Sequence, residues 1–107
     1  MSTHPAGTVA VIFINRRTAD DPDGYGAAAA AMDALASQQP GYRGIDSVRG
    51  ADGVGITVSY WADDATAKAW RDNPEHAAIR DRGRAHWYDW YNLHVAEVTR
   101  SYDWVKA

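Results

Sequence analysis

Residues Ser59–Tyr91 of this 107-residue chain read SYWADDATAKAWRDNPEHAAIRDRGRAHWYDWY. The stretch holds four of the five tryptophans and two of the four histidines. Within it, Asn73 is a capping residue type, Pro74 loses nothing in a first helical turn, and Glu75 complements the positive end of a helix dipole. The sequence therefore predicts a helix that begins at Asn73.

A shorter helix is predicted just upstream of this start. Asp63-Asp64 can cap a helical turn that continues through three alanines and ends at Trp70. Only a tight joint then separates the two helices. We therefore expect Trp70 and His76 to be neighbours across that joint.

The remaining patterns predict four strands and an alanine-rich helix. The stretch TVAVIFIN alternates β-branched and aromatic residues and is predicted to be a strand buried on both faces. Asp20 to Gly24 is turn-rich and is expected to separate this strand from the first helix. A bulge is expected near Ala96, where the apolar side of the last strand changes. The strands are predicted over residues 8–15, 42–48, 54–61 and 92–102, and the helix over residues 27–38.

The order of these elements is β-α-β-β-α-β, which is the ferredoxin-like arrangement of an α+β fold. We expect one domain over residues 1–107, an antiparallel sheet, and helices on one face of it. The surplus of aromatic and apolar residues on the other face predicts a symmetric homodimer in which two sheets pack together. A cavity between the sheet and its helices would be the natural site for a small ligand.

Composition narrows the range of functions. Hydrophobic residues make up 46% of the chain and charged residues 23%, and no apolar run has the length of a membrane span. The absence of cysteine excludes disulfides and thiolate chemistry. A net charge of -3 without a basic stripe argues against nucleic acid as a partner. The first residues, MSTHPAGT, do not resemble a targeting signal, so we expect a cytoplasmic protein without membrane contact.

Three residues are candidates for catalysis. Asn15 ends the apolar row of the first strand, where it could instead satisfy the backbone of the following loop. Trp70 could be a wall of the pocket or a core residue. His76 could act as a base in the pocket or only help to cap its helix.

Three further residues are candidates for substrate binding. Tyr60 lies on the third strand, and Arg80 would favour an anionic substrate unless it is simply a solvated helical charge. Trp87 belongs to an aromatic run, Trp87 to Tyr91, that could be a substrate platform but is more typical of packing at a dimer interface. No histidine spacing indicates a metal site, and no glycine pattern indicates a nucleotide cofactor.

Several motifs together resemble the antibiotic-biosynthesis monooxygenase superfamily of dimeric α+β barrels. They are the order of elements, Asn15 in an N-R-x-T context, the run YWADDATAKAWR, the NPEH helix start and the aromatic-rich last strand. The resemblance covers roughly Thr8 to Trp104. It implies the fold more specifically than the activity, because members of one fold family differ in chemistry.

The resemblance implies two chemistries. Some members oxidise aromatic polyketides with dioxygen and without metal or flavin, whereas others bind heme and open its ring. The heme-degrading members use an asparagine, a tryptophan and an iron-ligating histidine, and the corresponding positions here are Asn15, Trp70 and Arg80. Arginine stays protonated and cannot ligate iron as imidazole does, so only His76, one helical turn earlier, could take that role.

We therefore expect an oxygenase that acts on a small aromatic phenol or quinol without a cofactor. Such a substrate becomes electron-rich enough to reduce dioxygen once a base has removed its proton. Asn15 would bind an oxygen atom, Trp70 would form a wall, and His76 would be the base. The alternatives are a heme-degrading enzyme with altered ligation and a non-catalytic dimer that binds a small ligand.

Overall fold

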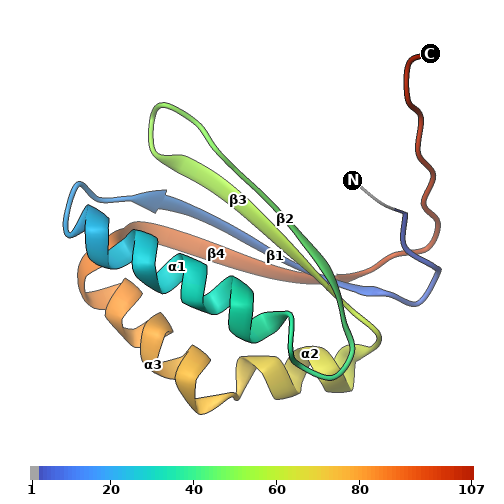
Figure 1. The fold of residues 1–107 in the computed structure, drawn as a ribbon, viewed down its shortest axis with the longest axis horizontal. Coiled ribbons are helices and arrows are strands. Elements are labelled where there is room, and N and C mark those ends of the chain that lie inside the picture. Colours follow the sequence, from blue (N-terminus) through green and yellow to red (C-terminus); the bar gives the residue numbers. More distant parts are fainter. Residues whose placement is uncertain (1–2) are drawn as a thin grey trace.

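The computed structural model describes residues 3–107 and confirms the predicted α+β architecture. Four antiparallel strands form one sheet in the order β2-β3-β1-β4, and the helices lie along one of its faces (Figure 1). The second helical segment of the predicted order consists of two helices and a π-helical turn, η1. In chain order the elements are β1 Val9–Arg17, α1 Pro22–Ala36, β2 Tyr42–Arg49, β3 Val54–Trp61, α2 Asp64–Arg71, α3 Pro74–Arg82, η1 Gly83–Trp87 and β4 Tyr88–Glu97.

The strand register decides which side chains face the helices. Val11 of β1 pairs with Ser59 of β3 and with Val95 of β4. Successive side chains of a strand point to opposite faces of the sheet. The cross-strand row that contains Val11, and every second row counted from it, therefore faces the helices. We call this the inner face of the sheet. Ile12 and its row belong to the opposite, outer face.

The first helix begins earlier than predicted. The sequence predicted a turn at Asp20 to Gly24 and a helix from residue 27, but α1 begins at Pro22. Asp21 is its N-cap in the left-handed conformation, with φ 47°, and its carboxylate accepts a hydrogen bond from the Gly24 N–H at 3.2 Å. Aspartate tolerates that conformation better than most residues. A pattern that usually ends regular structure is here the start of a helix.

Both predicted starts of the later helices are confirmed. Asp63 and Thr66 form a capping box at the N-terminus of α2. The side chain of Asn73 accepts hydrogen bonds from the N–H groups of Glu75 and His76, at 3.0 and 3.2 Å. The joint between α2 and α3 is therefore only two residues long, Asp72 and Asn73.

The last strand lies nearer the N-terminus than predicted. It was expected over residues 92–102, but β4 runs from Tyr88 to Glu97, opposite the whole length of β1. The expected bulge near Ala96 is wrong, because the register shifts instead at the start of β4, where Asp89 is the extra residue opposite Arg16 and Arg17 of β1. The aromatic run therefore belongs partly to the strand itself.

The core is centred on two stacked tryptophans. Trp61 of β3 is fully buried, and its ring centroid lies 5.8 Å from that of Trp70. The small buried side chains of Ala36 and Ala67 let α1 and α2 approach this pair closely. The core therefore occupies the end of the sheet where β3 enters α2.

The outer face of the sheet carries many apolar side chains that a single chain leaves uncovered. The expectation that the first strand is buried on both faces is not met by one chain alone, because Ile12 and Ile14 are only half-buried. By register, they share this face with further apolar side chains: Val48, Ile56, Val58 and Trp90. Trp90 is 42% exposed.

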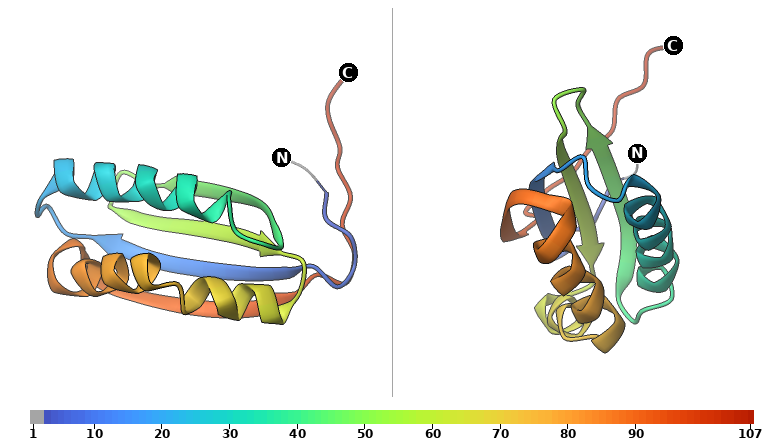
Figure 2. Two further views of the ribbon diagram at one scale, coloured as in Figure 1. Left: turned by 60° about the horizontal axis from the view of Figure 1, so that its bottom comes forward. Right: turned by 90° about the vertical axis from the view of Figure 1, so that its left-hand side faces the viewer.

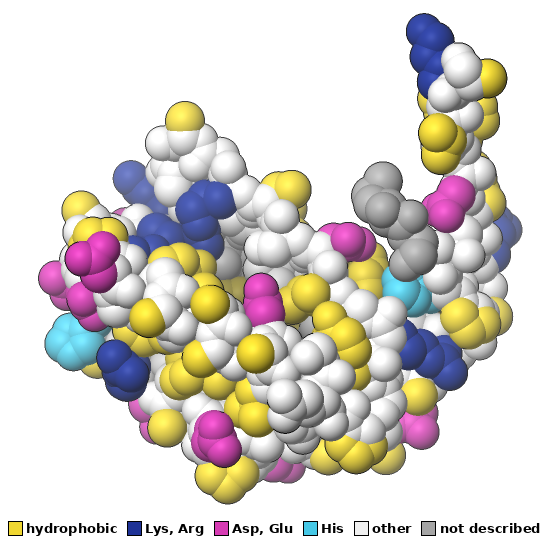
Figure 3. Space-filling model, in the orientation of Figure 1, with side chains coloured by type: hydrophobic (Ala, Val, Ile, Leu, Met, Phe, Trp, Pro, Cys, Tyr) yellow, Lys and Arg dark blue, Asp and Glu magenta, His cyan; other side chains and the backbone are white. Residues whose placement is uncertain are grey.

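A C-terminal tail follows the sheet. After backbone hydrogen bonds at Val98, the chain has no regular structure and extends away from the body (Figures 1 and 2). Three large apolar side chains on it are exposed: Tyr102, Trp104 and Val105. Hydrophobic side chains are visible along the tail and over the helical surface in Figure 3.

Candidate functional site

A cavity of about 680 Å³ lies between the inner face of the sheet and the helices. All four strands, the three α-helices and η1 contribute to its lining. Its volume is within the range of pockets that enclose drug-sized molecules. The cavity predicted between the sheet and its helices is thus present in the structure.

Trp70 and His76 meet at the α2–α3 joint and both line the cavity. Their ring centroids lie 4.2 Å apart, and the rings are inclined by only 12°. Trp70 is 8% exposed, and its ring also stacks on that of Trp61 in the core. The core therefore holds Trp70 in place, and Trp70 in turn holds the imidazole of His76.

The hydrogen bonding of His76 defines its reactive nitrogen. Its Nδ1 lies 2.9 Å from the carbonyl oxygen of Trp70. A carbonyl can only accept, so Nδ1 carries the proton and Nε2 of the neutral ring has a free lone pair. No hydrogen bond within residues 3–107 engages that Nε2.

Burial lowers the pKa of His76 below its ordinary value of 6.5. The hydrogen bond to the Trp70 carbonyl acts in the opposite direction, and the nearby charge of Arg80 lowers the pKa further. The imidazole is therefore neutral at neutral pH. A neutral imidazole with a free Nε2 in an apolar cavity is a suitable general base.

Arg80 lines the same cavity one helical turn after His76. Its Nη1 donates to the carbonyl of Arg71 at 3.3 Å, which is a long hydrogen bond. Its Nε is buried, and in the described part of the chain it has no acceptor. The predicted Arg80 is thus a cavity residue with unused donor capacity, and not a solvated helical charge.

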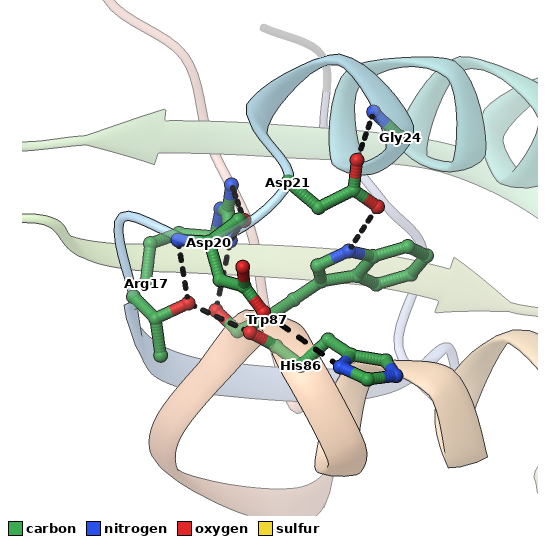
Figure 4. Close-up of polar contacts among 7 residues, drawn as sticks. Arg17, Asp20, Asp21, Gly24, His86 and Trp87 are labelled. Carbon is green, nitrogen blue, oxygen red and sulfur yellow. Dashed lines mark hydrogen bonds and ion pairs between the residues drawn. The ribbon is translucent and has the colours of Figure 1, made fainter.

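Trp87 lines the cavity from η1 and is tied to the loop that precedes α1 (Figure 4). Its Nε1 donates to the carboxylate of Asp21 at 3.2 Å, and its carbonyl accepts from Arg17 at 2.9 Å. Any side chain at Gly24 would collide with the Asp21 carboxylate. The absence of a side chain at Gly24 therefore leaves room for the Asp21 carboxylate, which accepts one hydrogen bond from the Gly24 N–H and another from the Trp87 indole.

Three tyrosines at the cavity were not singled out as site residues from the sequence. Tyr25, Tyr88 and Tyr91 all line it, and Arg84 Nε donates to the Tyr91 hydroxyl at 2.6 Å. Burial, with a smaller contribution from Tyr25, raises the pKa of Tyr88 well above its ordinary value. Tyr88 is therefore a neutral phenol at the cavity, and its hydroxyl interacts with that of Tyr25. Strict alternation along a strand would have placed Tyr88 and Tyr91 on opposite faces, and only the extra residue Asp89 brings both to the inner face, so the sequence carried no signal for this pair.

Asn15 lies at the end of the inner row formed by Val11 and Phe13, both of which line the cavity. It is 1% exposed and does not itself belong to the lining. Its cross-strand partner on β4, Tyr91, does. The side-chain oxygen of Asn15 is buried without a hydrogen-bond partner among residues 3–107. Asn15 is thus a buried polar group without a partner that lies next to the cavity lining, beside Tyr91.

Tyr60 is not brought to the cavity. By register it lies on the outer face, where it stacks on His4 with ring centroids 3.8 Å apart and donates to Asp46 at 3.2 Å. Trp90 also lies on the outer face, whereas Trp87 lines the cavity. The aromatic run predicted as interface packing is therefore divided between the two sides of the sheet.

Two further features bear on cofactors and membranes. No three histidine, aspartate or glutamate side chains gather as metal ligands anywhere in residues 3–107. Over the same residues, no helix is long and apolar enough to cross a membrane.

Comparison with known proteins begins from the sequence. Residues 8–82 match the family model described as antibiotic biosynthesis monooxygenase. The chain is 47% identical over 91 residues to the uncharacterized protein YqjZ of Bacillus subtilis, and this match covers 85% of the chain and 79% of that protein.

Solved structures share the fold at low sequence identity. A mutant of SnoaB, a cofactor-independent oxygenase from Streptomyces nogalater, matches with a TM-score of 0.76 and 15% identity, covering 89% of this chain and 96% of that one. A protein described as a putative antibiotic biosynthesis monooxygenase from Nitrosomonas europaea also has a TM-score of 0.76, with 11% identity and coverage of 89% and 93%. The family match spans most of the chain and the structural matches agree with it, so the chain belongs to the antibiotic biosynthesis monooxygenase family.

Proposed function

We propose that this protein is an oxygenase that oxidises a small polycyclic phenol or quinol with dioxygen and needs no cofactor. In the overall reaction, the substrate loses two hydrogen atoms and gains one oxygen atom to become a quinone, and the second oxygen atom leaves as water. The substrate itself supplies all four electrons that dioxygen accepts. The protein must therefore remove a proton and hold the resulting anion away from water.

The observation that carries this proposal is the state of His76. A neutral imidazole with a free Nε2, stacked on Trp70, lines a largely apolar cavity. His76 takes the phenolic proton, and Trp70 forms the flat wall against which a fused ring lies. Tyr88, a neutral phenol at the cavity, adds a further aromatic surface beside the substrate. The name of SnoaB, a cofactor-independent oxygenase of the same fold, is consistent with this chemistry.

Oxygen consumption tests the proposal directly. The purified protein, treated with a chelator, is supplied with a panel of naphthols, naphthoquinols and anthrones in an oxygen-electrode cell. We expect saturable uptake of one dioxygen for each quinone formed, above the rate of autoxidation. No uptake above the blank with any member of the panel would contradict the proposed activity.

Asn15 is proposed to serve this site at a cost in stability. A buried carbonyl oxygen without a partner is unfavourable by about 1–3 kcal/mol. We expect Asn15→Val to raise the free energy of unfolding by about 1 kcal/mol, because valine suits a buried strand and needs no hydrogen bond. We also expect it to lower the rate of oxygen uptake.

Glu97→Val, at an exposed residue of β4 that lies on the inner face and outside the lining of the large cavity, is the control. Urea denaturation should show a change below about 0.5 kcal/mol for that variant. If Asn15→Val destabilised the protein, the side chain would have a structural partner after all.

A second candidate function has one observation in its favour. A histidine whose Nδ1–H is held by a backbone carbonyl presents Nε2 as metal-ligating histidines do. His76 could thus ligate a heme iron in place of Arg80, which cannot. A hemin titration of the wild type and of His76→Gln separates the two candidates. A saturable Soret shift that depends on His76 would favour heme binding.

We further propose that a second copy of the chain covers the outer face. The apolar row that includes Ile14 and Ile56 has no cover in one chain, and the tail presents Trp104 at 78% exposure. Monomeric proteins rarely expose large apolar patches. Two copies related by a twofold axis would bury both features together.

Substitutions in the tail test the dimer. We expect the wild type to sediment with twice the chain mass of 11.7 kDa. The double variant Trp104→Asp, Val105→Asp should weaken the dimer by about 2 kcal/mol or more, as loss of a central aromatic contact does. Lys106→Glu, which changes a polar residue of the same tail, should leave it intact. A wild type that sediments as a single chain would rule out the dimer.

A further inference from the structure

The charges around the cavity are unevenly neutralised. Four cationic side chains line it: Lys68, Arg71, Arg80 and Arg84. Three of them have an anionic or hydroxyl partner within 3.0 Å, in the pairs Lys68–Asp64, Arg71–Asp72 and Arg84–Tyr91. The Tyr91 hydroxyl is neutral, so Arg84 is hydrogen-bonded there but not neutralised, and the charge of Arg80 acts on the Asp72 carboxylate only from beyond contact distance. Within residues 3–107, Arg80 alone of the four cations has neither a carboxylate nor a hydroxyl group in contact with its donors.

The unoccupied donors of Arg80 lie on one edge of its guanidinium. Nη1 is used by the Arg71 carbonyl, whereas Nε is buried without an acceptor and Nη2 makes no hydrogen bond to the described residues. The Nε–Nη2 edge is the one that binds both oxygens of a carboxylate in parallel. A phenolate offers a single oxygen and could not pair with both N–H groups of this edge in parallel.

We propose that the cavity recognises an aromatic carboxylic acid whose carboxylate is bound bidentately by Nε and Nη2 of Arg80. The inference rests on the proposed function for the aromatic part of the substrate and adds the identity of its polar substituent. It makes Arg80 a binding residue that selects the substrate, and His76 the base that acts on it.

The helix places the two roles side by side. His76 and Arg80 are four residues apart on α3, so their side chains project on the same face of it. A carboxylate at Arg80 would put the attached ring next to the Trp70–His76 stack. The guanidinium can turn toward this ligand because its hydrogen bond to the Arg71 carbonyl, at 3.3 Å, is long and weak.

Isothermal titration at pH 7.5 and low salt, with 2-naphthoate and its neutral isostere 2-naphthamide, tests the inference. We expect the wild type to bind the carboxylate at least about tenfold more tightly than the amide, as a charge-assisted bidentate contact implies. Arg80→Gln should abolish this preference while leaving the affinity for the amide unchanged. Arg80→Lys, which keeps the charge without the fork, should retain only part of it.

Arg82→Gln is the matched control, because it removes one charge from the same helix at a position outside the cavity lining. It should preserve the preference for the carboxylate. If the ratio of the affinities for 2-naphthoate and 2-naphthamide were the same in the wild type and in Arg80→Gln, the inference would be overturned. The absence of saturable binding by either compound would also overturn it. Tighter binding of 2-naphthol than of 2-naphthoate, lost in Arg80→Gln, would also overturn it and assign Arg80 to a phenolate.

Binding requires no turnover, so this result is independent of the proposed activity. A carboxylate preference without oxygen uptake would contradict the oxygenase and leave the carboxylate site standing. Uptake with neutral phenols but no carboxylate preference would contradict the carboxylate site alone.

Discussion

His76→Gln is expected to lower the turnover number by about 10²–10⁴-fold, which is the usual contribution of a general base. Glutamine can still donate a hydrogen bond to the Trp70 carbonyl, so the helix joint is preserved, but it has no basic nitrogen. The Michaelis constant should change little. Steady-state oxygen uptake with the best substrate from the panel measures both constants.

His86→Gln is the matched control for this substitution. The His86 side chain is mostly exposed and lies 3.7 Å from Asp20, outside the cavity lining. Its turnover should equal that of the wild type. If His76→Gln stayed within a few-fold of the wild type, the base would have to be sought elsewhere in the cavity.

The pH profile should show the same group. Because burial lowers the pKa of His76, the neutral base persists below pH 6.5, and kcat/KM should fall only at more acidic pH. Arg80→Gln removes a charge that lowers this pKa, so the acidic limb of the kcat/KM profile should move to higher pH.

The free energy of unfolding should also depend on the protonation of His76. The unfolded chain binds the proton more readily than the folded chain, so the stability that His76 contributes is complete above pH 6.5 and is lost as the pH falls.

Trp70→Ala is expected to lower the free energy of unfolding by about 3–5 kcal/mol, as other truncations of buried large side chains do. The change removes the contacts that Trp70 makes with Trp61 and with the His76 imidazole. It should therefore also loosen His76 and reduce turnover. Urea denaturation at fixed protein concentration, followed by circular dichroism, measures the stability.

Trp70→Phe is the comparison variant for this residue. It keeps an aromatic ring between Trp61 and His76, so its loss of stability should be well below that of alanine, and its turnover should be partly preserved. A loss below about 1 kcal/mol for Trp70→Ala would mean that the indole is a wall of the pocket that the core does not need.

The helix starts could be predicted from the sequence because caps are local. Asp63 and Asn73 satisfy N–H groups two or three residues away, so neighbouring residues suffice to recognise them. The juxtaposition of Trp70 and His76 followed from these two caps. The sequence Asp20 to Gly24 was ambiguous because the same residue types occur in turns and at helix starts. Trp87 favours the helix start by donating a hydrogen bond to Asp21, but it is distant in sequence.

Other features depended on contacts that no local pattern contains. The ends of β4 and the outward position of Tyr60 follow from the register with β1, since a shift of one residue reverses the face of every side chain in a strand. The missing partners of Asn15 and Arg80 are likewise visible only when their surroundings are assembled. Short-range hydrogen bonding and periodicity thus determined the elements and their order, whereas cross-strand pairing and helix packing decided which side chains share the cavity and which remain unsatisfied there.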